Sequence, residues 1–257
     1  MEYKNKLYCM DNLELMKQLP DKCINLIYCD ILYNTGKKFS DYEDNLGTPQ
    51  EAIQWYEPRL IEMKRLLKDT GSIYLQCDYR LVYYLKVKMD EIFGFNNFRN
   101  DIVWSYKTGG VSKHTFAKKH DNILFYTKSR NYNFNTQYYK SYQQKKYNYN
   151  AKYPEIWDED KKLWYHNSIC RDVWEDINVL GTDNNIKEKN NYDTQKPKKL
   201  LERIINASSN NGDLVADFFM GSGTTCVVAK ELGRDYLGCD INQNAIDITY
   251  ERLQEIR

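Results

Sequence analysis

The sequence contains no apolar stretch that approaches the roughly 18 consecutive residues required to cross a lipid bilayer. Its first seven residues carry no apolar signal core, which argues against export and against a targeting peptide. The seven cysteines are odd in number and never spaced C-x-x-C, so neither a disulfide framework nor a zinc cage is indicated. Cysteines used in this way are typical of a reducing cytoplasm. The three histidines form no metal-ligand pattern, so a metalloenzyme is not expected.

Positive charge is unevenly distributed along the chain. The 257 residues carry a formal net charge of only +1. Between Ile102 and Pro154, however, ten Lys and Arg residues stand against a single acid, Asp121. Such a basic block in an otherwise neutral protein predicts a surface that faces a polyanion. The block is also rich in tyrosine, although the whole chain has 23 tyrosines, so part of this enrichment is compositional.

Patterns of buried strands and amphipathic helices alternate in the first and last parts of the chain, which is typical of an α/β protein with a parallel sheet. The helix predicted over residues 49–68 has apolar residues at helical spacing and Thr48 as a candidate N-cap. Further helices are predicted over 80–93, around 200–205, over 226–232 and from near residue 244 onward. Strands are predicted at 24–29, 72–77, 102–104, 122–126, 213–219 and 236–240.

Residues 128–192 break this alternation. They are polar, rich in Tyr, Asn and Lys, and show no sustained period. Three tryptophans, Trp157, Trp164 and Trp174, indicate that the segment has a small core of its own with local β-structure. The sequence therefore predicts a first part of the core over 1–127, an insert over 128–192 and a second part of the core over 193–257.

A glycine turn between a strand and a helix marks a candidate cofactor site. Strand 213–219 is followed by Gly221-Ser222-Gly223, a helix, and a further strand that ends at Asp240. Glycines let backbone N–H groups approach a ligand, the helix N-terminus favours an anionic group, and an acid at the next strand end can bind ribose hydroxyls. Cys226 stands where a dinucleotide fingerprint has its third glycine, which favours a cofactor with an amino-acid carboxylate over NAD. An ordinary βα turn is the alternative interpretation.

The remaining strands of this sheet must come from residues before 130, because only one more strand follows the glycine turn. Ligands bind at the carboxyl ends of the strands in such sheets, so the loop after strand 24–29 is expected in the same crevice. That loop reads Asp30-Ile31-Leu32-Tyr33-Asn34-Thr35-Gly36.

Four ordered motifs resemble those of the β-class DNA amino-methyltransferases, in which the catalytic motif precedes the cofactor motif. The loop 30–36 resembles their D-P-P-Y-N-T-G form, as in type III modification subunits, and 217–225 resembles their D-P-F-x-G-S-G-T-T cofactor loop. Residues 194–197 are similar to their T-Q-K-P segment, and Asp11 to their acid near the N-terminus. Residues 71–75 and 120–124 also match family stretches.

The resemblance covers about 1–127 and 193–257. It implies a doubly wound, mostly parallel Rossmann-like methyltransferase sheet with a circularly permuted motif order. The insert 128–192 is then expected to be the target-recognition region. The implied cofactor is S-adenosyl-L-methionine and the implied substrate is double-stranded DNA. A homodimer and a cognate restriction endonuclease are further partners that the family suggests, whereas no metal and no membrane are expected.

The resemblance also assigns individual residues. Those implied to form the catalytic loop are Asp30, Ile31, Leu32 and Tyr33. Those implied to bind the cofactor are Asp11, Asp30, Gln195, Lys196, Asp217, Phe218, Phe219, Gly221, Gly223, Thr224, Thr225 and Asp240. DNA contacts are expected from Lys107, Lys113, Lys118, Lys119, Lys145 and Lys146 of the basic block.

This chain departs from the family in two respects. Ile31 and Leu32 stand in place of the paired prolines, so the loop loses two fixed φ angles, and Tyr192-Asp193 stands where the family has H-P before T-Q-K-P. The Asp30 carboxylate and the Ile31 carbonyl would accept the two N–H groups of an exocyclic amine, and Tyr33 would stack on the extruded base. Asp at the first position favours adenine, so the prediction is a site-specific adenine-N6 DNA methyltransferase. The alternatives are methylation of cytosine N4, of RNA or of a protein amide, and a catalytically weakened DNA-binding or partner subunit of the same fold.

Overall fold

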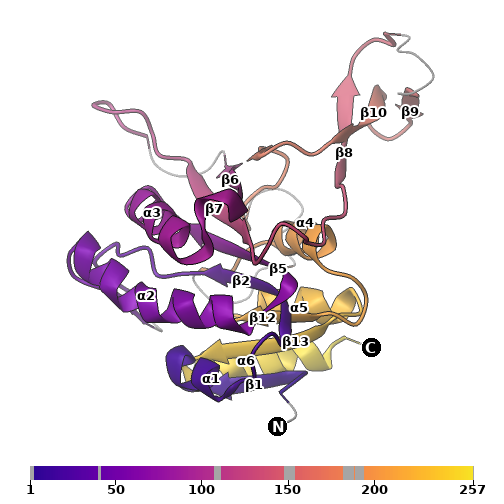
Figure 1. Ribbon diagram of the computed structural model, residues 1–257. Helices are drawn as coiled ribbons and strands as arrows, with labels where there is room; N and C mark the ends of the chain where they lie inside the picture. The colour runs from indigo at the N-terminus through magenta and orange to yellow at the C-terminus, as the bar shows by residue number, and fades with distance from the viewer. Residues whose placement is uncertain are drawn as a thin grey trace. The chain divides into compact units, whose positions relative to one another are not determined.

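The computed structural model describes residues 3–39, 42–106, 111–147, 154–181, 188 and 194–256. Its centre is an eight-stranded sheet with the strand order β1-β13-β12-β2-β5-β7-β6-β11 (Figure 1). Neighbouring strands are parallel except where β7 pairs with β5 and β6. The predicted mostly parallel α/β sheet is therefore confirmed. The strands are β1 (Lys6–Cys9), β2 (Ile24–Asp30), β5 (Leu67–Cys77), β6 (Phe98–Ser105), β7 (His120–Thr127), β11 (Val173–Trp174), β12 (Leu214–Asp217) and β13 (Asp235–Asp240).

Helices cover both faces of this sheet through two hydrophobic clusters. The first cluster joins α1 (Asn12–Gln18), α2 (Pro49–Leu66) and α3 (Val82–Phe93) to one face (Figure 1). The second cluster joins α4 (Lys198–Ser208) and α5 (Thr224–Glu231) to the other face, and α6 (Gln243–Gln254) packs beside α5. Side chains of β2 alternate between the clusters, with Ile27 and Cys29 in the first and Leu26 and Tyr28 in the second. Burial on both faces explains why this strand reads as a continuous apolar run. In the described part of the chain, no helix has the length and apolarity to cross a membrane.

Helix α2 and strand β5 follow one another directly, which differs from the predicted boundary. The helix begins with a capping box in which the Thr48 hydroxyl accepts from the Glu51 backbone N–H and the Glu51 carboxylate accepts from the Thr48 N–H. It ends at Leu66, two residues earlier than expected, and β5 begins at Leu67 instead of residue 72. The first part of β5 pairs with β2 across a register shift, with Ile24 opposite Leu67. A bulge of this kind leaves no mark in apolar periodicity, so the sequence there reads as a turn.

Two elements near the N-terminus, β1 and α1, were not predicted. β1 has four residues and pairs in parallel with β13 at the edge of the sheet. α1 has seven residues and is capped by Asp11, whose carboxylate accepts from the backbone N–H groups of Leu13 and Glu14. Both elements are too short to show a reliable period. The Met10 N–H donates to the Asp240 carbonyl at 3.1 Å, so this segment lies at the end of β13.

Strand β7 brings a second part of the chain to the edge where β2 and β5 end. Because β7 runs antiparallel to β5, its first residues lie beside the last residues of β5, with Gln76 opposite Ile123. Asp121 is therefore at the same edge of the sheet as Asp30, the last residue of β2. The segment that joins β6 to β7 leaves the sheet at this edge as well.

The chain divides into two compact units. Unit 1 comprises Met1–Phe134 and Asp172–Arg257, and unit 2 comprises Asn135–Arg171. Unit 2 contains an antiparallel sheet in the order β8-β10-β9, formed by β8 (Tyr138–Gln143), β10 (Leu163–Ile169) and β9 (Ile156–Asp158). The local β-structure expected within the insert is thus present, in a segment shorter than the predicted one.

The tryptophans expected to share the insert's core are divided between the units. Trp157 and Trp164 contact each other in unit 2, with ring centroids 5.4 Å apart. Trp174 belongs to unit 1, where β11 pairs with β6 and places this ring opposite Trp104 in the second cluster. The prediction is therefore wrong for Trp174, because two residues of parallel pairing are too few to be recognised as a strand.

Candidate active site

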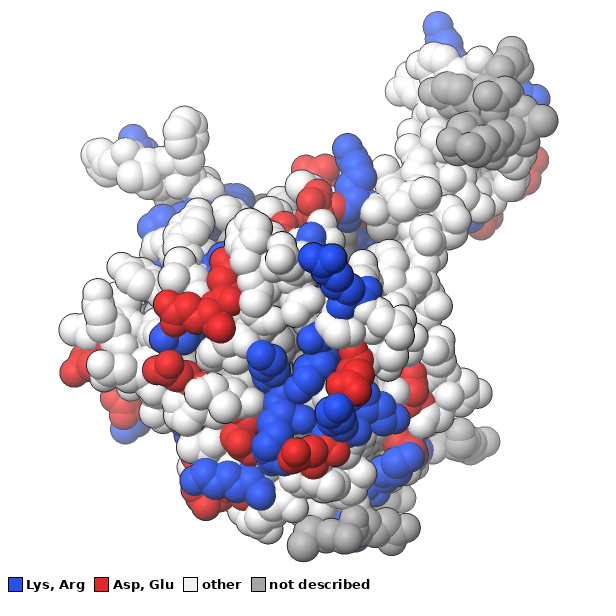
Figure 2. All heavy atoms as spheres, viewed as in Figure 1, with Lys and Arg blue, Asp and Glu red and all other residues white. Residues whose placement is uncertain are grey.

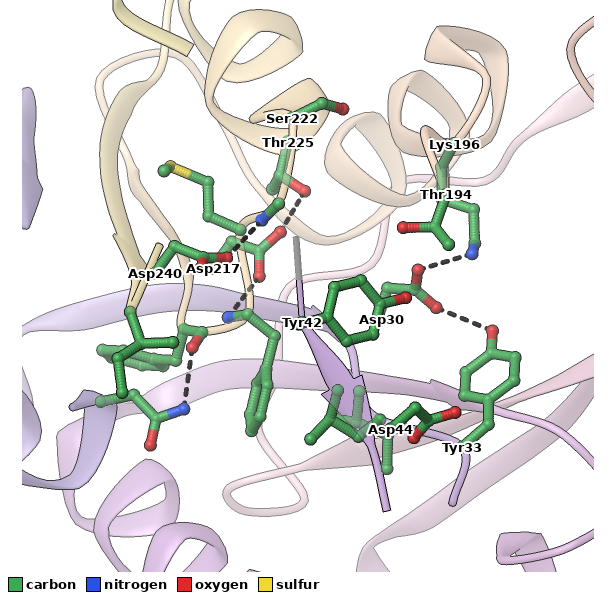
Figure 3. A pocket seen from close by; sticks show the side chains of 18 of the residues that line it. Asp30, Tyr33, Tyr42, Asp44, Thr194, Lys196, Asp217, Ser222, Thr225 and Asp240 are labelled. Atoms are coloured by element: carbon green, nitrogen blue, oxygen red, sulfur yellow. Dashed lines mark hydrogen bonds and ion pairs between the residues drawn. The ribbon is translucent and has the colours of Figure 1, made fainter. Parts of the chain in front are cut away.

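A cavity of about 390 Å³ lies at the carboxyl ends of three adjacent strands, where ligands bind in sheets of this type. Asp30 ends β2, Asp217 ends β12 and Asp240 ends β13, and all three line the cavity (Figure 3). The volume is in the range of small-molecule sites. Other lining residues come from α2, from the segment before α4, and from a hairpin formed by β3 (Lys37–Lys38) and β4 (Glu43–Asp44).

The Asp30 carboxylate has one partner on each oxygen. Lys196 Nζ lies 2.5 Å from Oδ2, and the Tyr33 hydroxyl donates to Oδ1 at 2.7 Å. Figure 3 shows both side chains turned toward Asp30. Burial raises the pKa of Asp30 above its usual value, while the charge of Lys196 and the hydroxyl of Tyr33 oppose that rise. Each carboxylate oxygen has two lone pairs, so Asp30 can accept a further hydrogen bond from a ligand.

The loop after β2 is held in place without prolines. The Ile31 N–H donates to the Gln76 carbonyl at 3.2 Å, and the Ile31 side chain is buried in the first cluster. The Tyr56 hydroxyl donates to the Leu32 carbonyl at 2.9 Å. These contacts supply the rigidity that two fixed φ angles would otherwise give to the loop.

Asp217, at the end of β12, is a buried carboxyl with an unusually high pKa. It accepts from the Thr225 hydroxyl at 2.6 Å and from the Phe219 backbone N–H at 3.0 Å. Burial is the main cause that raises the pKa of Asp217 to about 7, and the negative charges of Asp30 and Asp240 add to the rise. A cation in the cavity would favour the ionised form of this carboxyl, so the site suits a positively charged ligand.

The glycine turn between β12 and α5 is fixed by the chain around it. The Asp240 carboxylate accepts from the Gly221 N–H at 2.8 Å, which connects the end of β13 to the turn. Gly223 has a φ of 73°, and a Cβ at this position would lie 2.2 Å from the Thr249 side chain. Only glycine therefore fits at the start of α5.

Acidic side chains dominate the charged part of the cavity lining. Among the described residues, Lys196 is the one cation that lines the cavity, against Asp11, Asp30, Glu43, Asp44, Asp217 and Asp240. The described residues include no group of three or more His, Cys, Asp or Glu side chains arranged to hold a metal ion.

Residues 24–251 match the profile of the N6/N4 methyltransferase family, described as DNA methylase. The chain belongs to this family of DNA methylases. It is 31% identical to the DNA adenine methyltransferase YhdJ of Escherichia coli K12, over 95% of this chain and 80% of that protein. The cytosine-N4-specific PvuII DNA methyltransferase shares the fold with a TM-score of 0.67 and 17% identity, covering 97% of this chain and 86% of that one. The M1.HpyAVI–SAM complex also shares the fold, with a TM-score of 0.59 and 22% identity, covering 96% of this chain and 99% of that one.

The methylase fold brings most of the residues predicted from the sequence to the cavity. All four residues of the predicted catalytic loop line it. Of those predicted for the cofactor, the lining includes Asp11, Asp30, Lys196, Asp217, Phe218, Phe219, Gly221, Thr224, Thr225 and Asp240. Gly223 lies at the N-cap of α5, and Gln195 donates its side-chain amide to the Glu188 carbonyl at 2.8 Å.

The lysines predicted to contact DNA lie in two segments of this methylase. Lys118 Nζ lies 3.8 Å from the ring centroid of Tyr79, and Lys146 Nζ lies 4.9 Å from that of Trp164. Figure 2 shows a face on which Lys and Arg side chains are mixed with Asp and Glu side chains. This face is therefore neither wholly positive nor wholly negative. Lys113, Lys118 and Lys119 lie between β6 and β7, Lys145 and Lys146 follow β8, and Lys107 lies outside the described residues.

The β3–β4 hairpin contributes lining residues that sequence reasoning missed. Asp44 is buried and accepts from the Asn34 N–H at 2.8 Å and from the Thr35 hydroxyl at 2.6 Å, which fixes the end of the loop that follows β2. Tyr42 lies beside Asp30 in Figure 3. Strands of two residues are too short to show alternation, so the sequence offers no signal that separates this hairpin from a surface loop.

Arg59 of α2 is a second residue that sequence reasoning missed. Its side chain is 7% exposed and donates to Asp11 Oδ2 at 2.8 Å and to Asn12 Oδ1 at 2.7 Å. The guanidinium also lies 3.4 Å from the ring centroid of Trp55. Arg59 thus supports two lining residues, Asp11 and Trp55. The sequence did contain one signal of its burial, because Arg59 stands at helical spacing from the apolar positions 52, 56 and 63 and so lies on the buried face of α2.

Proposed function

We propose that the chain methylates the exocyclic N6 amine of an adenine in double-stranded DNA, with S-adenosyl-L-methionine as the methyl donor. The proposal is carried by the convergence of Asp30 and Tyr33 with the glycine turn at one cavity. Membership of the DNA methylase family supports DNA as the substrate, and the SAM bound in the related M1.HpyAVI structure supports the cofactor. Asp at the first position of the loop and the likeness to the adenine methyltransferase YhdJ support adenine.

The lining residues fit S-adenosyl-L-methionine. Its sulfonium and ammonium cations suit the acidic lining, and its adenine ring suits apolar and aromatic side chains such as Met10, Phe219 and Ile241. Asp240 at the end of β13 is placed to hold the ribose hydroxyls. When bound, this cofactor supplies a methyl group activated by a positively charged sulfur.

The contribution of the chain itself is to hold and orient the target amine. An adenine amine is a poor nucleophile because its lone pair is delocalised into the ring. The Asp30 carboxylate accepts one N–H and the Ile31 carbonyl accepts the other, which favours a pyramidal nitrogen with a localised lone pair. Tyr33 stacks on the base after extrusion, since the amine cannot be reached inside the duplex. The raised pKa of Asp30 suits it to hold the proton that the methylated amine releases.

Unit 2 and the surrounding residues 128–192 are the proposed target-recognition region. This assignment is supported by the concentration of Lys and aromatic side chains there, including the contact of Lys146 with the ring of Trp164. Backbone phosphates attract such lysines whatever the base sequence. A homodimer and a cognate restriction endonuclease stay predictions.

Mass spectrometry of nucleosides tests the proposal after incubation of the protein with unmethylated genomic DNA and S-adenosyl-L-methionine. The expected product is N6-methyldeoxyadenosine, formed by the wild type and by Asp69→Ala, an exposed control, and absent with Asp30→Ala although that variant still binds the cofactor. N4-methyldeoxycytidine would overturn the base assignment in favour of the second candidate, which the likeness to the cytosine-N4-specific PvuII enzyme favours. No methylated base with bound cofactor would point to an RNA substrate or to a subunit without catalytic activity.

A further inference from the structure

Asp121, in β7, is a buried carboxylate whose hydrogen-bond donors among the described residues are all neutral. It is 6% exposed. Its Oδ2 accepts from the Tyr33 hydroxyl at 3.0 Å and from Gln76 Nε2 at 2.9 Å, and its Oδ1 accepts from the Tyr106 hydroxyl at 3.2 Å. Across the described part of the chain, no ion pair includes Asp121. Burying a carboxylate without a paired cation costs free energy, which makes Asp121 a candidate for a functional role.

The Tyr33 hydroxyl links Asp121 to Asp30. It donates toward Asp30 Oδ1 at 2.7 Å and Asp121 Oδ2 at 3.0 Å, and it accepts from Gln76 Nε2 at 3.2 Å. One phenolic proton is thus shared by two carboxylates. Burial and these two negative charges raise the pKa of Tyr33 well above its usual value, so the phenol keeps that proton. Three contacts at one hydroxyl fix the direction of the Tyr33 ring, which lines the cavity.

Gln76 completes this arrangement from β5. It is fully buried, and its Oε1 accepts from the Tyr28 hydroxyl at 2.7 Å. This bond sets the orientation of the amide, so that Nε2 faces both Tyr33 and Asp121. Neither Gln76 nor Asp121 lines the cavity. Among the lining residues, the Asp121 side chain is hydrogen-bonded to Tyr33, and the Gln76 side chain to Tyr33 and Tyr28, so Asp121 reaches the cavity through Tyr33.

We infer that Asp121 is a positioning residue for methyl transfer, acting through the Tyr33 hydroxyl. It fixes the hydroxyl that donates to Asp30, and it thereby orients the ring that stacks on the extruded base. The inference rests on the proposed function.

The test compares Asp121→Asn with a matched variant, Asp78→Asn. Asp78 is also a buried aspartate and is paired with Arg80. The measured quantities are the single-turnover rate of methyl transfer, the Kd for cofactor, the Kd for DNA and the melting temperature. Asp121→Asn should lower the rate on the order of tenfold or more, because a small misplacement of bound groups can slow a reaction by this much. Both Kd values should stay near those of the wild type. Asp78→Asn can lower the melting temperature but should keep the wild-type rate.

A double-mutant cycle separates positioning from a merely structural role. Tyr33→Phe keeps the ring and removes the hydroxyl, so Asp121→Asn should cause no further loss of rate in the Tyr33→Phe background. Losses that multiply, or an Asp121→Asn variant as fast as the wild type, would overturn the inference. Should Asp121→Asn fail to fold, Gln76→Met, which removes the donor common to Tyr33 and Asp121, enters the same cycle in a Tyr28→Phe background, so that no Tyr28 hydroxyl is left unpaired, with the same expected outcome. A wild-type protein that forms no methylated base would instead contradict the proposed function.

Discussion

Lys196 Nζ lies 2.5 Å from Asp30 Oδ2, and both residues line the same cavity. The Lys196 side chain is 16% exposed. Burial opposes the charge of the lysine, but the attraction of Asp30 and Asp121 outweighs it and raises the pKa of Lys196. The ammonium therefore keeps its charge at neutral pH. The charge of Lys196 in turn opposes the rise that burial causes in the pKa of Asp30, so Lys196 favours the ionised carboxylate.

Lys196→Met should move the acid limb of the methyl-transfer rate to higher pH. The Lys196 charge lowers the pKa of Asp30, so its removal leaves burial less opposed and raises that pKa further. In the proposed mechanism methyl transfer requires the ionised Asp30 carboxylate, and a higher pH is then needed to form it. Single-turnover rates measured from about pH 5 to 9 at saturating cofactor test this expectation. Lys198→Met is the control, because Lys198 pairs with Glu231 instead. An acid limb at the wild-type position would show that Lys196 does not tune Asp30.

Ile31→Pro is expected to lower both stability and activity although it introduces the residue found in the D-P-P-Y-N-T-G motif that this loop resembles. Proline has no N–H, so the bond to the Gln76 carbonyl is lost together with part of a buried side chain. The expected loss is about 1–3 kcal/mol in the free energy of unfolding. Ile31→Val, the matched control, keeps the N–H and should lose only about 0.5–1.5 kcal/mol. A Pro variant more active than the wild type would show that the missing proline limits this enzyme.

Asp217→Asn should change how stability depends on pH. The folded protein holds a proton on Asp217 up to about pH 7, whereas the unfolded chain releases it near the ordinary value of 3.8. The folded state then binds more protons between these values, so the stability due to this group is lost as pH rises through 7. Asn does not titrate. The melting temperature of the variant minus that of the wild type should therefore increase from about pH 5 to 8. A constant difference would contradict the high pKa of Asp217.

The sequence was sufficient to predict that Asp30 lies near Asp217 and Asp240, although they are far apart in the chain, because the ends of parallel strands are held at one edge of a sheet. Asp30, Asp217 and Asp240 each follow an apolar run, and parallel strands in one sheet end at one edge. The glycine turn carried a similar constraint, since Gly223 has a φ that other residues rarely adopt. Both features can be recognised in short stretches of sequence. The rule that ligands bind at the carboxyl ends of parallel strands was then enough to predict one shared site.

The missing parts of the site depend on register and on short elements, which local patterns do not encode. Asp121 stands in a stretch that resembles the family, but its contact with Tyr33 follows from the antiparallel pairing of β7 with β5. Asp44 reaches the loop after β2 through a hairpin of two-residue strands. Trp174 joins the core through a two-residue strand at the far edge of the sheet. In each case a tertiary contact decides the position, and apolar periodicity carries no information about it.

Replacing lysines of the basic block should reduce the salt dependence of DNA binding. Each lost phosphate contact lowers the slope of log K against log salt by about 0.9. Lys113→Ala combined with Lys118→Ala tests the segment between β6 and β7, and Lys145→Ala combined with Lys146→Ala tests unit 2. Each pair should lower the slope by up to about 2 and weaken binding similarly on unrelated duplexes.

The control for these pairs is Lys17→Ala combined with Lys22→Ala, because both lysines form exposed ion pairs outside the basic block. Binding is measured by fluorescence anisotropy at several salt concentrations with a labelled duplex. If only the β6–β7 pair changed the slope, Lys145 and Lys146 would not contact phosphates, because lysines that do so release counterions when DNA binds. Unit 2 would then contact the bases or make no contact with DNA. An unchanged slope for both pairs would place the DNA on another surface of the molecule.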